Sequence, residues 1–217
     1  FINDNRIPNH YFDDTLKEIH LLKIENSYLE PAAFLKIANN SSTVNELLKF
    51  FKKFKEYYPT LFLKSEEIEY ENFIVENIQK YISPFAEVND NATPTLKQIR
   101  SEINAVRGKI SASFTKALAY YNSSGYLDEI RESVVDNKRV LAVKAMYRRK
   151  VQGSIMGGSK TGSIVYIEPE TTLQFSRELN NLEYEEKEEV IRVLKEVTNY
   201  IRPFSKLLED SQYFLVA

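Results

Sequence analysis

A stretch rich in lysine and arginine contains the side chains of this sequence that are best suited to binding chemistry. Between Asn137 and Ile167 the chain has no Asp or Glu. The basic residues of this stretch are Lys138, Arg139, Lys144, Arg148, Arg149, Lys150 and Lys160. Lysine and arginine bind phosphate oxygens without reading base sequence, and the planar guanidinium group suits phosphate geometry. These residues therefore predict a DNA-binding site that contacts the phosphate backbone.

Composition alone leaves two interpretations of this basic stretch open. Four of the chain's glycines, at positions 153, 157, 158 and 162, lie inside or beside it. A glycine-rich loop lets backbone N–H groups approach the same phosphates as the cations. The second interpretation is a solvated hairpin whose charges only maintain solubility. The net charge of −2 over the whole chain does not by itself indicate a nucleic-acid binder.

Other kinds of site lack the residues that their chemistry needs. Residues 157–161 resemble a nucleotide-binding loop, but Ser159 stands where a P-loop has the glycine before its lysine. The chain has no cysteine, and its two histidines are His10 and His20. The glutamates between 183 and 189 spread around a predicted helix, which indicates a solvated surface. We therefore expect no catalytic residue, no metal site and no cofactor site in this chain.

The basic residues lie in a segment, about 126–169, that has the composition of a small β-sheet. Residues 140–143 and 164–167 are β-branched and apolar, and residues 151–155 lie between them. This pattern predicts three strands. It places Arg148, Arg149 and Lys150 on the first turn.

A long helix is predicted on each side of this segment. Thr93 and Pro94 start the first one, from about 94 to 122, and Gly125 ends it. From Leu96 to Ile110 its apolar residues alternate at intervals of three and four, as in a coiled-coil seam. Residues 179–201 have a similar spacing. The two helices predict an antiparallel arm with the β segment at its tip.

Short helices separated by breakers are predicted for the first 85 or so residues. Pro31 suits the first turn of a helix. Thr43 and Glu46 have the spacing of a capping box, which predicts a further helix start. Pro59 and Pro84 end two of the apolar runs. Because each helix is apolar on one side only, we expect these helices to pack on each other.

Five pieces of sequence, in order along the chain, resemble the MutS family. The resemblance is in particular to the second bacterial branch of the family. This branch is associated with recombination intermediates more than with mismatch recognition. The pieces are residues 28–31 with 50–51 and 58–59, residues 89–96 with 99–100, residues 139–144, residues 153–169, and residues 180–182 with 185–186 and 191. The resemblance covers nearly the whole chain. This sequence departs from the family pattern at Met156 and Gly157, where members often carry His-Asp. It also departs at Ile164, where members often carry threonine.

The resemblance implies a mainly α fold class, with a helical core, two long antiparallel lever helices and a small β-rich clamp inserted at the tip. In family terms the parts are a core at 1–92, a first lever helix at 93–125, the clamp at 126–169 and a returning lever helix at 170–217. The family's clamp closes over duplex or branched DNA through sequence-independent backbone contacts.

The resemblance also implies a longer parent protein that acts in DNA repair or recombination control. This parent would be a homodimeric ATPase of the bacterial cytoplasm, with no membrane association. ATP and Mg would bind in an ATPase domain beyond Ala217, and some members carry a C-terminal nuclease module. The alternative function is a structural or dimerisation arm without DNA contact, which pairs through residues 179–201.

Overall fold

The computed structural model describes residues 6–217, which form two compact units. The first unit contains the described residues up to Lys97 together with residues 188–217. The second unit contains residues 98–187. Within the described part of the chain, no helix is long and apolar enough to cross a membrane.

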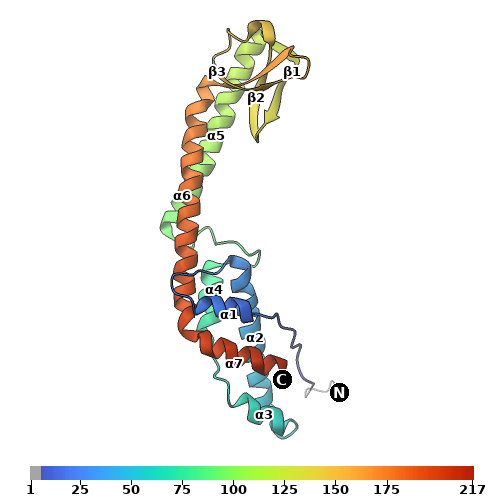
Figure 1. Ribbon diagram of the computed structural model, residues 1–217, viewed down its shortest axis with the longest axis vertical. Helices are drawn as coiled ribbons and strands as arrows, with labels where there is room; N and C mark the ends of the chain where they lie inside the picture. The colour runs from blue at the N-terminus through green and yellow to red at the C-terminus, as the bar shows by residue number, and fades with distance from the viewer. Residues whose placement is uncertain (1–5) are drawn as a thin grey trace. The chain divides into compact units, whose positions relative to one another are not determined.

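The first unit is helical. Its helices are α1 (Leu16–Leu22), α2 (Pro31–Lys53), α3 (Pro59–Ser65), α4 (Phe73–Tyr81), the C-terminal part of α6 (Glu170–Ile201), a short 3-10 turn (Arg202–Phe204) and α7 (Ser205–Val216) (Figure 1). Pro31 and Pro59 each occupy the first position of their helix, where the missing N–H costs no hydrogen bond. The apolar faces meet in one core, in which Phe34, Ile78 and Val197 are fully enclosed.

Helix α2 runs without a break through Thr43, so the helix start predicted there is wrong. Two asparagines buried on this helix bond to the backbone of neighbouring segments. The amide nitrogen of Asn40 donates to the carbonyl of Asp13 at 2.8 Å, and that of Asn45 donates to the carbonyl of Glu71 at 2.7 Å. Polar residues in this part of the sequence therefore connect the helix to neighbouring loops and do not end it.

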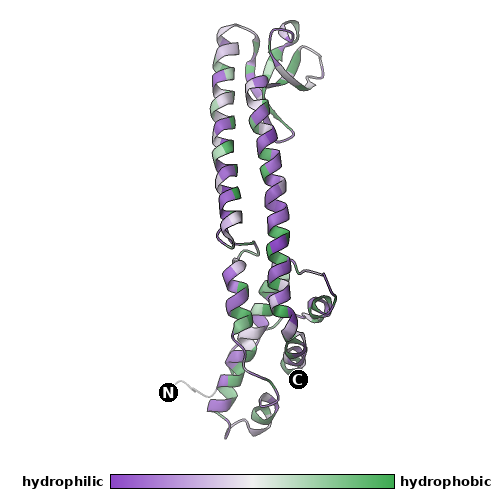
Figure 2. Cartoon of the chain, turned by 90° about the vertical axis from the view of Figure 1, so that its left-hand side faces the viewer, coloured by the Kyte–Doolittle hydropathy of each residue, from purple (hydrophilic) through white to green (hydrophobic). Residues whose placement is uncertain are grey.

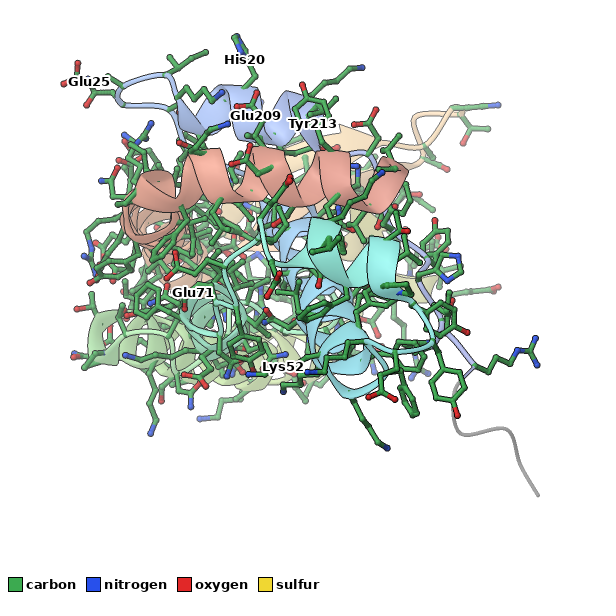
Figure 3. The ribbon with its side chains drawn as sticks, turned by 90° about the horizontal axis from the view of Figure 1, so that it is seen from below. His20, Glu25, Lys52, Glu71, Glu209 and Tyr213 are labelled. Atoms are coloured by element: carbon green, nitrogen blue, oxygen red, sulfur yellow. The ribbon has the colours of Figure 1, made fainter. Side chains whose placement is uncertain are left out.

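Helix α7 is joined to the start of α1 and to α2 by a buried polar contact. The amide oxygen of Gln212 accepts hydrogen bonds from the hydroxyl of Thr15 at 2.6 Å and from Asn40 at 3.2 Å. At the surface, Lys23 forms an ion pair of 2.8 Å with Glu209. Figure 3 shows α7, which carries the labelled Glu209, beside α1.

The second unit contains a four-stranded antiparallel sheet in the order β1-β2-β4-β3 (Figure 1). Its strands are β1 (Leu127–Val135), β2 (Lys138–Lys144), β3 (Gly153–Gly158) and β4 (Ile164–Pro169). Asp136 and Asn137 join β1 to β2 with φ values of 48° and 61°. Positive φ at both residues is what a two-residue type I′ hairpin turn requires, and Asp and Asn tolerate it.

The helical part of the second unit consists of residues from α5 (Pro94–Ser123) and the first part of α6. These segments run in opposite directions, because Arg100 pairs with Glu186 at 2.7 Å and Arg107 pairs with Glu183 at 3.1 Å. Figure 2 shows hydrophilic residues over most of α6. Phe114, which is 1% exposed, packs from α5 into the core of the sheet.

The structure corrects the predicted fold class. The sheet has four strands and not three, because β1 was not predicted. The arrangement of two long antiparallel lever helices with a clamp inserted at their tip is wrong. Both helices contribute residues to each of two compact units, and α6 divides between them after Lys187.

The predicted coiled-coil seam is also not one continuous seam. Leu96 packs in the helical core of the first unit, Ile99 and Ile103 pack with Leu182, and Phe114 packs with the sheet. The spacing of apolar residues indicates which side chains are buried, but it does not indicate which neighbours bury them.

Candidate nucleic-acid interface

The basic residues at the start of β2 are paired with carboxylates. The amine of Lys138 donates to Oε2 of Glu168 at 3.3 Å, and the hydroxyl of Ser176 donates to the other carboxylate oxygen. The side chain of Glu168 is only 4% exposed. A buried carboxylate is tolerated when it is paired and hydrogen-bonded. Lys138 therefore helps to stabilise the end of β4.

Arg139 has two partners within the second unit. Its Nε and Nη2 atoms donate to Oε2 of Glu132, on β1, at 2.9 and 2.7 Å. Its guanidinium carbon lies 4.3 Å from the centre of the Phe114 ring, in a cation–π contact. These contacts connect the sheet to α5 and occupy the face of the guanidinium group.

The connection from β2 to β3 presents three consecutive cations. After a 3-10 turn at Ala145–Tyr147, the amides of Arg148 and Lys150 donate to the carbonyls of Ala145 and Tyr147, at 3.3 and 2.8 Å. Arg148, Arg149 and Lys150 are exposed. Within residues 6–217, no acceptor lies within hydrogen-bonding or ion-pair distance of their side chains. We call these three residues the basic turn.

Two further predicted residues, Lys144 and Lys160, lie beside this connection. Lys144 is exposed at the end of β2, and its amine makes one long contact of 3.5 Å to the carbonyl of Gly125. Lys160 is exposed in the β3–β4 loop. The backbone amide of Ala145 donates to the carbonyl of Ser163 at 2.9 Å, so the two connections touch. This contact places the β3–β4 loop, which carries Lys160, against the segment that follows Lys144.

Hydroxyl groups hold the β3–β4 loop in shape. The Oγ1 atom of Thr161 lies 2.8 Å from the hydroxyl of Ser163, and the hydroxyl of Ser159 accepts from the amide of Ile164 at 3.1 Å. The amide of Gly162 donates to the carbonyl of Ser159 at 3.0 Å, with a φ of 71° at the glycine. The glycine-rich stretch is therefore a hairpin loop between two strands.

Aromatic residues flank the basic turn. The ring centres of Tyr126 and Tyr147 are 4.9 Å apart, and those of Tyr121 and Tyr126 are 6.5 Å apart. The hydroxyl of Tyr121 accepts from the amide of Gln152 at 3.3 Å, which attaches the C-terminal side of the turn to α5. Tyrosines of α5 and of the segment just before β1 therefore lie beside the basic turn.

A cleft of about 320 Å³ opens beside this tyrosine cluster. Its lining residues are Ser113, Lys116, Ala117, Tyr120, Tyr121, Gln152, Pro169, Glu170 and Thr171. Sequence reasoning missed Lys116, Tyr120 and Tyr121. The available signal was the spacing of four residues between Lys116 and Tyr120 along one predicted helix, which places this lysine beside that tyrosine.

The negative charges of the sheet region are concentrated on β1. Asp128, Glu129 and Glu132 lie on this edge strand, whereas the basic turn lies between β2 and β3. Leu127 of β1 pairs with Val143 of β2, and the amide of Lys144 donates to the carbonyl of Tyr126 at 3.0 Å, so the start of this acidic strand lies beside the end of β2 from which the basic turn leaves.

The acidic run at 183–189 was predicted to be a solvated helix surface with salt bridges to Lys187 and Arg192, and Arg192 pairs with Glu189 at 2.8 Å. Glu183 and Glu186 pair with arginines of α5, and Glu189 is 9% exposed. Hydrogen bonds from Arg192 and, secondarily, from Thr93 lower the pKa of the Glu189 carboxyl, against the opposing effect of its burial. Across the described residues, no group of three His, Cys, Asp or Glu side chains could hold a metal ion.

The apolar residues predicted as a dimerisation seam are buried within this chain. Leu182 packs against α5, and Val193, Val197 and Ile201 lie in the helical core of the first unit. These side chains are 8% exposed or less. The spacing from residue 179 to 201 is therefore accounted for by contacts within the chain.

Comparison with curated proteins identifies relatives over most of the chain. The chain is 32% identical over 177 residues to a protein named endonuclease MutS2 from Carboxydothermus hydrogenoformans, covering 76% of this chain and 23% of the relative. It is 25% identical over 210 residues to the endonuclease MutS2 of Caldicellulosiruptor bescii, covering 97% of this chain and 26% of the relative. A third endonuclease MutS2, from Pelotomaculum thermopropionicum, is 28% identical over 174 residues, covering 80% of this chain and 22% of the relative.

The chain spans about a quarter of the length of these curated relatives. No protein-family model matches it. The names of the relatives agree with the resemblance to the second bacterial branch of the MutS family. Along most of its length, this chain is similar to a segment of MutS2-like proteins.

Proposed function

We propose that this chain is a DNA-binding segment of a MutS2-like protein and that the basic turn holds duplex or branched DNA by phosphate contacts. One observation carries the proposal. Arg148, Arg149 and Lys150 are consecutive and exposed, and they have no acceptor among residues 6–217. Exposed cations of this kind exchange their counterions for phosphates, which makes binding independent of base sequence and sensitive to salt.

The seven predicted residues have different roles in this proposal. The basic turn contacts the phosphates, and Lys144 and Lys160 extend the contact along the same side. Lys138 and Arg139 keep the sheet in shape, because their carboxylate partners already occupy them. In this proposal, five of the seven predicted residues contact DNA phosphates and the other two stabilise the sheet.

The relatives' name supports a DNA-related role, and nuclease activity is a property that their name gives to those proteins. We propose that this segment contributes the DNA contact in a longer protein of that kind. The same proposal includes two expectations for the longer protein: that it forms a homodimer, and that it binds ATP and Mg outside this segment. Both are supported by the family resemblance alone.

The test is a salt titration of binding to a labelled duplex and to a labelled four-way junction. We compare the unaltered chain with the double variant Arg148→Glu and Arg149→Glu. The matched control is Arg177→Glu with Lys187→Glu, which reverses two exposed charges on α6 in the same unit. The proposal expects salt-sensitive binding that the basic-turn variant abolishes and the control retains. Equal affinity of the two double variants would refute the assignment.

A further inference from the structure

The end of α2 and the start of α3 form a second surface in which lysines and aromatic rings alternate. Residues 49–64 contain five lysines and one acidic residue, Glu56. The aromatic residues of the same stretch are Phe50, Phe51, Phe54, Tyr57, Tyr58 and Phe62. All of these residues belong to the first unit. The basic turn lies in the second unit, so this surface is separate from the site described above.

Three of these rings form a stripe. The ring centres of Phe50 and Phe54 are 4.8 Å apart, and those of Phe54 and Tyr57 are 6.3 Å apart. The spacing of four and then three residues keeps them on one side of the helix end, because the turn continues past Lys53. There the amide of Tyr57 donates to the carbonyl of Phe54 at 2.9 Å. Tyr57 is 67% exposed, and the two phenylalanines are half-buried.

Lysines lie over and beside this stripe. The amine of Lys53 is 4.9 Å from the centre of the Phe54 ring, and the amine of Lys49 is 4.9 Å from the centre of the Tyr70 ring. Lys52 and Lys55 are exposed, and within the described residues no acceptor lies within bonding distance of either amine. In Figure 3, Lys52 lies on the side of α2 away from α7.

We infer that this surface, which we call the aromatic stripe, binds single-stranded nucleic acid, with bases stacked on the rings and phosphates held by the lysines. Surfaces that bind single strands without sequence preference combine cations along the backbone path with aromatic side chains that accept base stacking. Tyr57, whose ring centre lies 6.3 Å from that of Phe54, is the exposed ring of the stripe and offers the face on which a base stacks.

An anionic membrane surface would attract the same lysines, but the apolar side of α2 argues against it. Leu47, Leu48 and Phe51 are at most 9% exposed, because they pack inside the first unit. A membrane-surface helix needs this side free to enter the lipid. The exposed large apolar side chains of residues 49–64 are Tyr57 and Leu63, and lysines surround them. This is less apolar surface than the continuous face that a membrane-surface helix inserts, whereas the Tyr57 ring suits a planar base.

A tryptophan reporter tests the stacking directly. The chain has no tryptophan, so Tyr57→Trp introduces a single one on the stripe. A thymidine oligomer of about 15 nucleotides is long enough to span such a site. Stacking predicts that this oligomer quenches the tryptophan fluorescence. A blue shift with vesicles of anionic phospholipid, and no quenching by the oligomer, would overturn the proposal in favour of a membrane contact.

Affinity measurements on the full chain distinguish the contribution of the aromatic rings to oligomer binding from that of the lysines. Tyr57→Leu removes the exposed ring and should weaken oligomer binding about tenfold, in line with the loss of one stacked base. The matched control is Tyr184→Leu, at a tyrosine of the second unit that is 65% exposed. Lys52→Ala with Lys55→Ala removes two cations and should lower the slope of log affinity against log salt by about 1.4, at roughly 0.7 per phosphate contact of a single strand. The control pair, Lys17→Ala with Lys97→Ala, should leave the slope unchanged.

A uridine oligomer of the same length distinguishes RNA from DNA as the source of the strand. Sensitivity to Tyr57→Leu with either oligomer supports the proposal, and insensitivity with both overturns it. This inference does not depend on the basic turn, so the two can fail separately. If Arg148→Glu with Arg149→Glu abolishes duplex binding while Tyr57→Leu changes neither oligomer titration, the proposed function stands and the aromatic stripe is refuted. The reverse pattern refutes the basic turn and retains the stripe.

Discussion

The amine of Lys138 lies 3.3 Å from Oε2 of Glu168, a carboxylate that is 4% exposed. The lysine begins β2 and the glutamate lies near the end of β4, so this pair joins two neighbouring strands. The hydroxyl of Ser176 donates to the other oxygen of the same carboxylate and extends the contact to α6. A residue that the sequence presents as one more cation of a phosphate-binding set is therefore part of the packing of the second unit.

Replacing Lys138 with methionine should lower the free energy of unfolding by about 2 kcal/mol, because it leaves a buried carboxylate with one hydrogen bond. The expected loss is below that of a fully buried pair, because the lysine side chain is 35% exposed. Urea denaturation measures it. Lys160→Met, at an exposed lysine, should change the stability by less than about 0.5 kcal/mol. An equal loss in both variants would show that the pair does not stabilise the fold.

Arg139 and Arg149 should differ in their effect on DNA binding. Arg149→Ala removes an exposed cation of the basic turn and should lower the slope of log affinity against log salt by about 0.9 for duplex DNA. Arg139→Gln removes a guanidinium group that already bonds Glu132 and contacts the Phe114 ring. It should leave this slope unchanged and lower the thermal stability. The same slope change for both would place Arg139 among the phosphate contacts.

Gly153→Ala should disrupt the pairing of β3 with β4. A Cβ atom at this position would lie 2.0 Å from the carbonyl oxygen of Glu168, a backbone atom that cannot move aside cheaply. We expect a loss of more than about 2 kcal/mol in the free energy of unfolding. Gly108→Ala is the control, because no atom lies within 4 Å of its added Cβ. On a helix this control should raise stability by up to about 1 kcal/mol.

The contribution of Glu189 to stability should depend on pH in the acidic range. The hydrogen bond from Arg192 holds the carboxyl pKa below its ordinary value. The folded chain therefore binds this proton less tightly than the unfolded chain. The stabilisation is complete above the unfolded-state pKa and is lost as pH falls through the folded-state pKa. Denaturation of the unaltered chain and of Glu189→Gln, from neutral pH to below pH ~4, should show a difference that shrinks with acidity. A constant difference would contradict this sign.

The order of the main elements was largely predictable from local patterns. Thr93, Pro94 and Gly125 mark the ends of α5, and the helix observed at Pro94–Ser123 confirms the range predicted as 94–122. The apolar strands at 140–143 and 164–167 are confirmed within β2 and β4. These signals are local, because a turn residue or an apolar run acts through the backbone conformation of its own segment.

Strand β1 was not predicted, because its residues do not have the composition of a typical strand. Four of its nine residues, Asp128, Glu129, Arg131 and Glu132, are charged. An edge strand has one solvated side and tolerates such residues, so its hydrogen bonds to β2 and not its own propensity make it a strand. The bulge near Arg131, where φ is 58°, further breaks the alternation that sequence reasoning looks for.

The sequence by itself determined which residues carry positive charge and that they lie in a glycine-rich β segment. Only the tertiary structure decided which of these cations are available. Pairing of β1 with β2 brings Glu132, opposite Leu141, within reach of Arg139 two residues along the strand, and pairing of β2 with β4 brings Glu168 within reach of Lys138. Charge is a property of a residue type, whereas availability depends on partners that strand pairing and packing bring from distant parts of the chain.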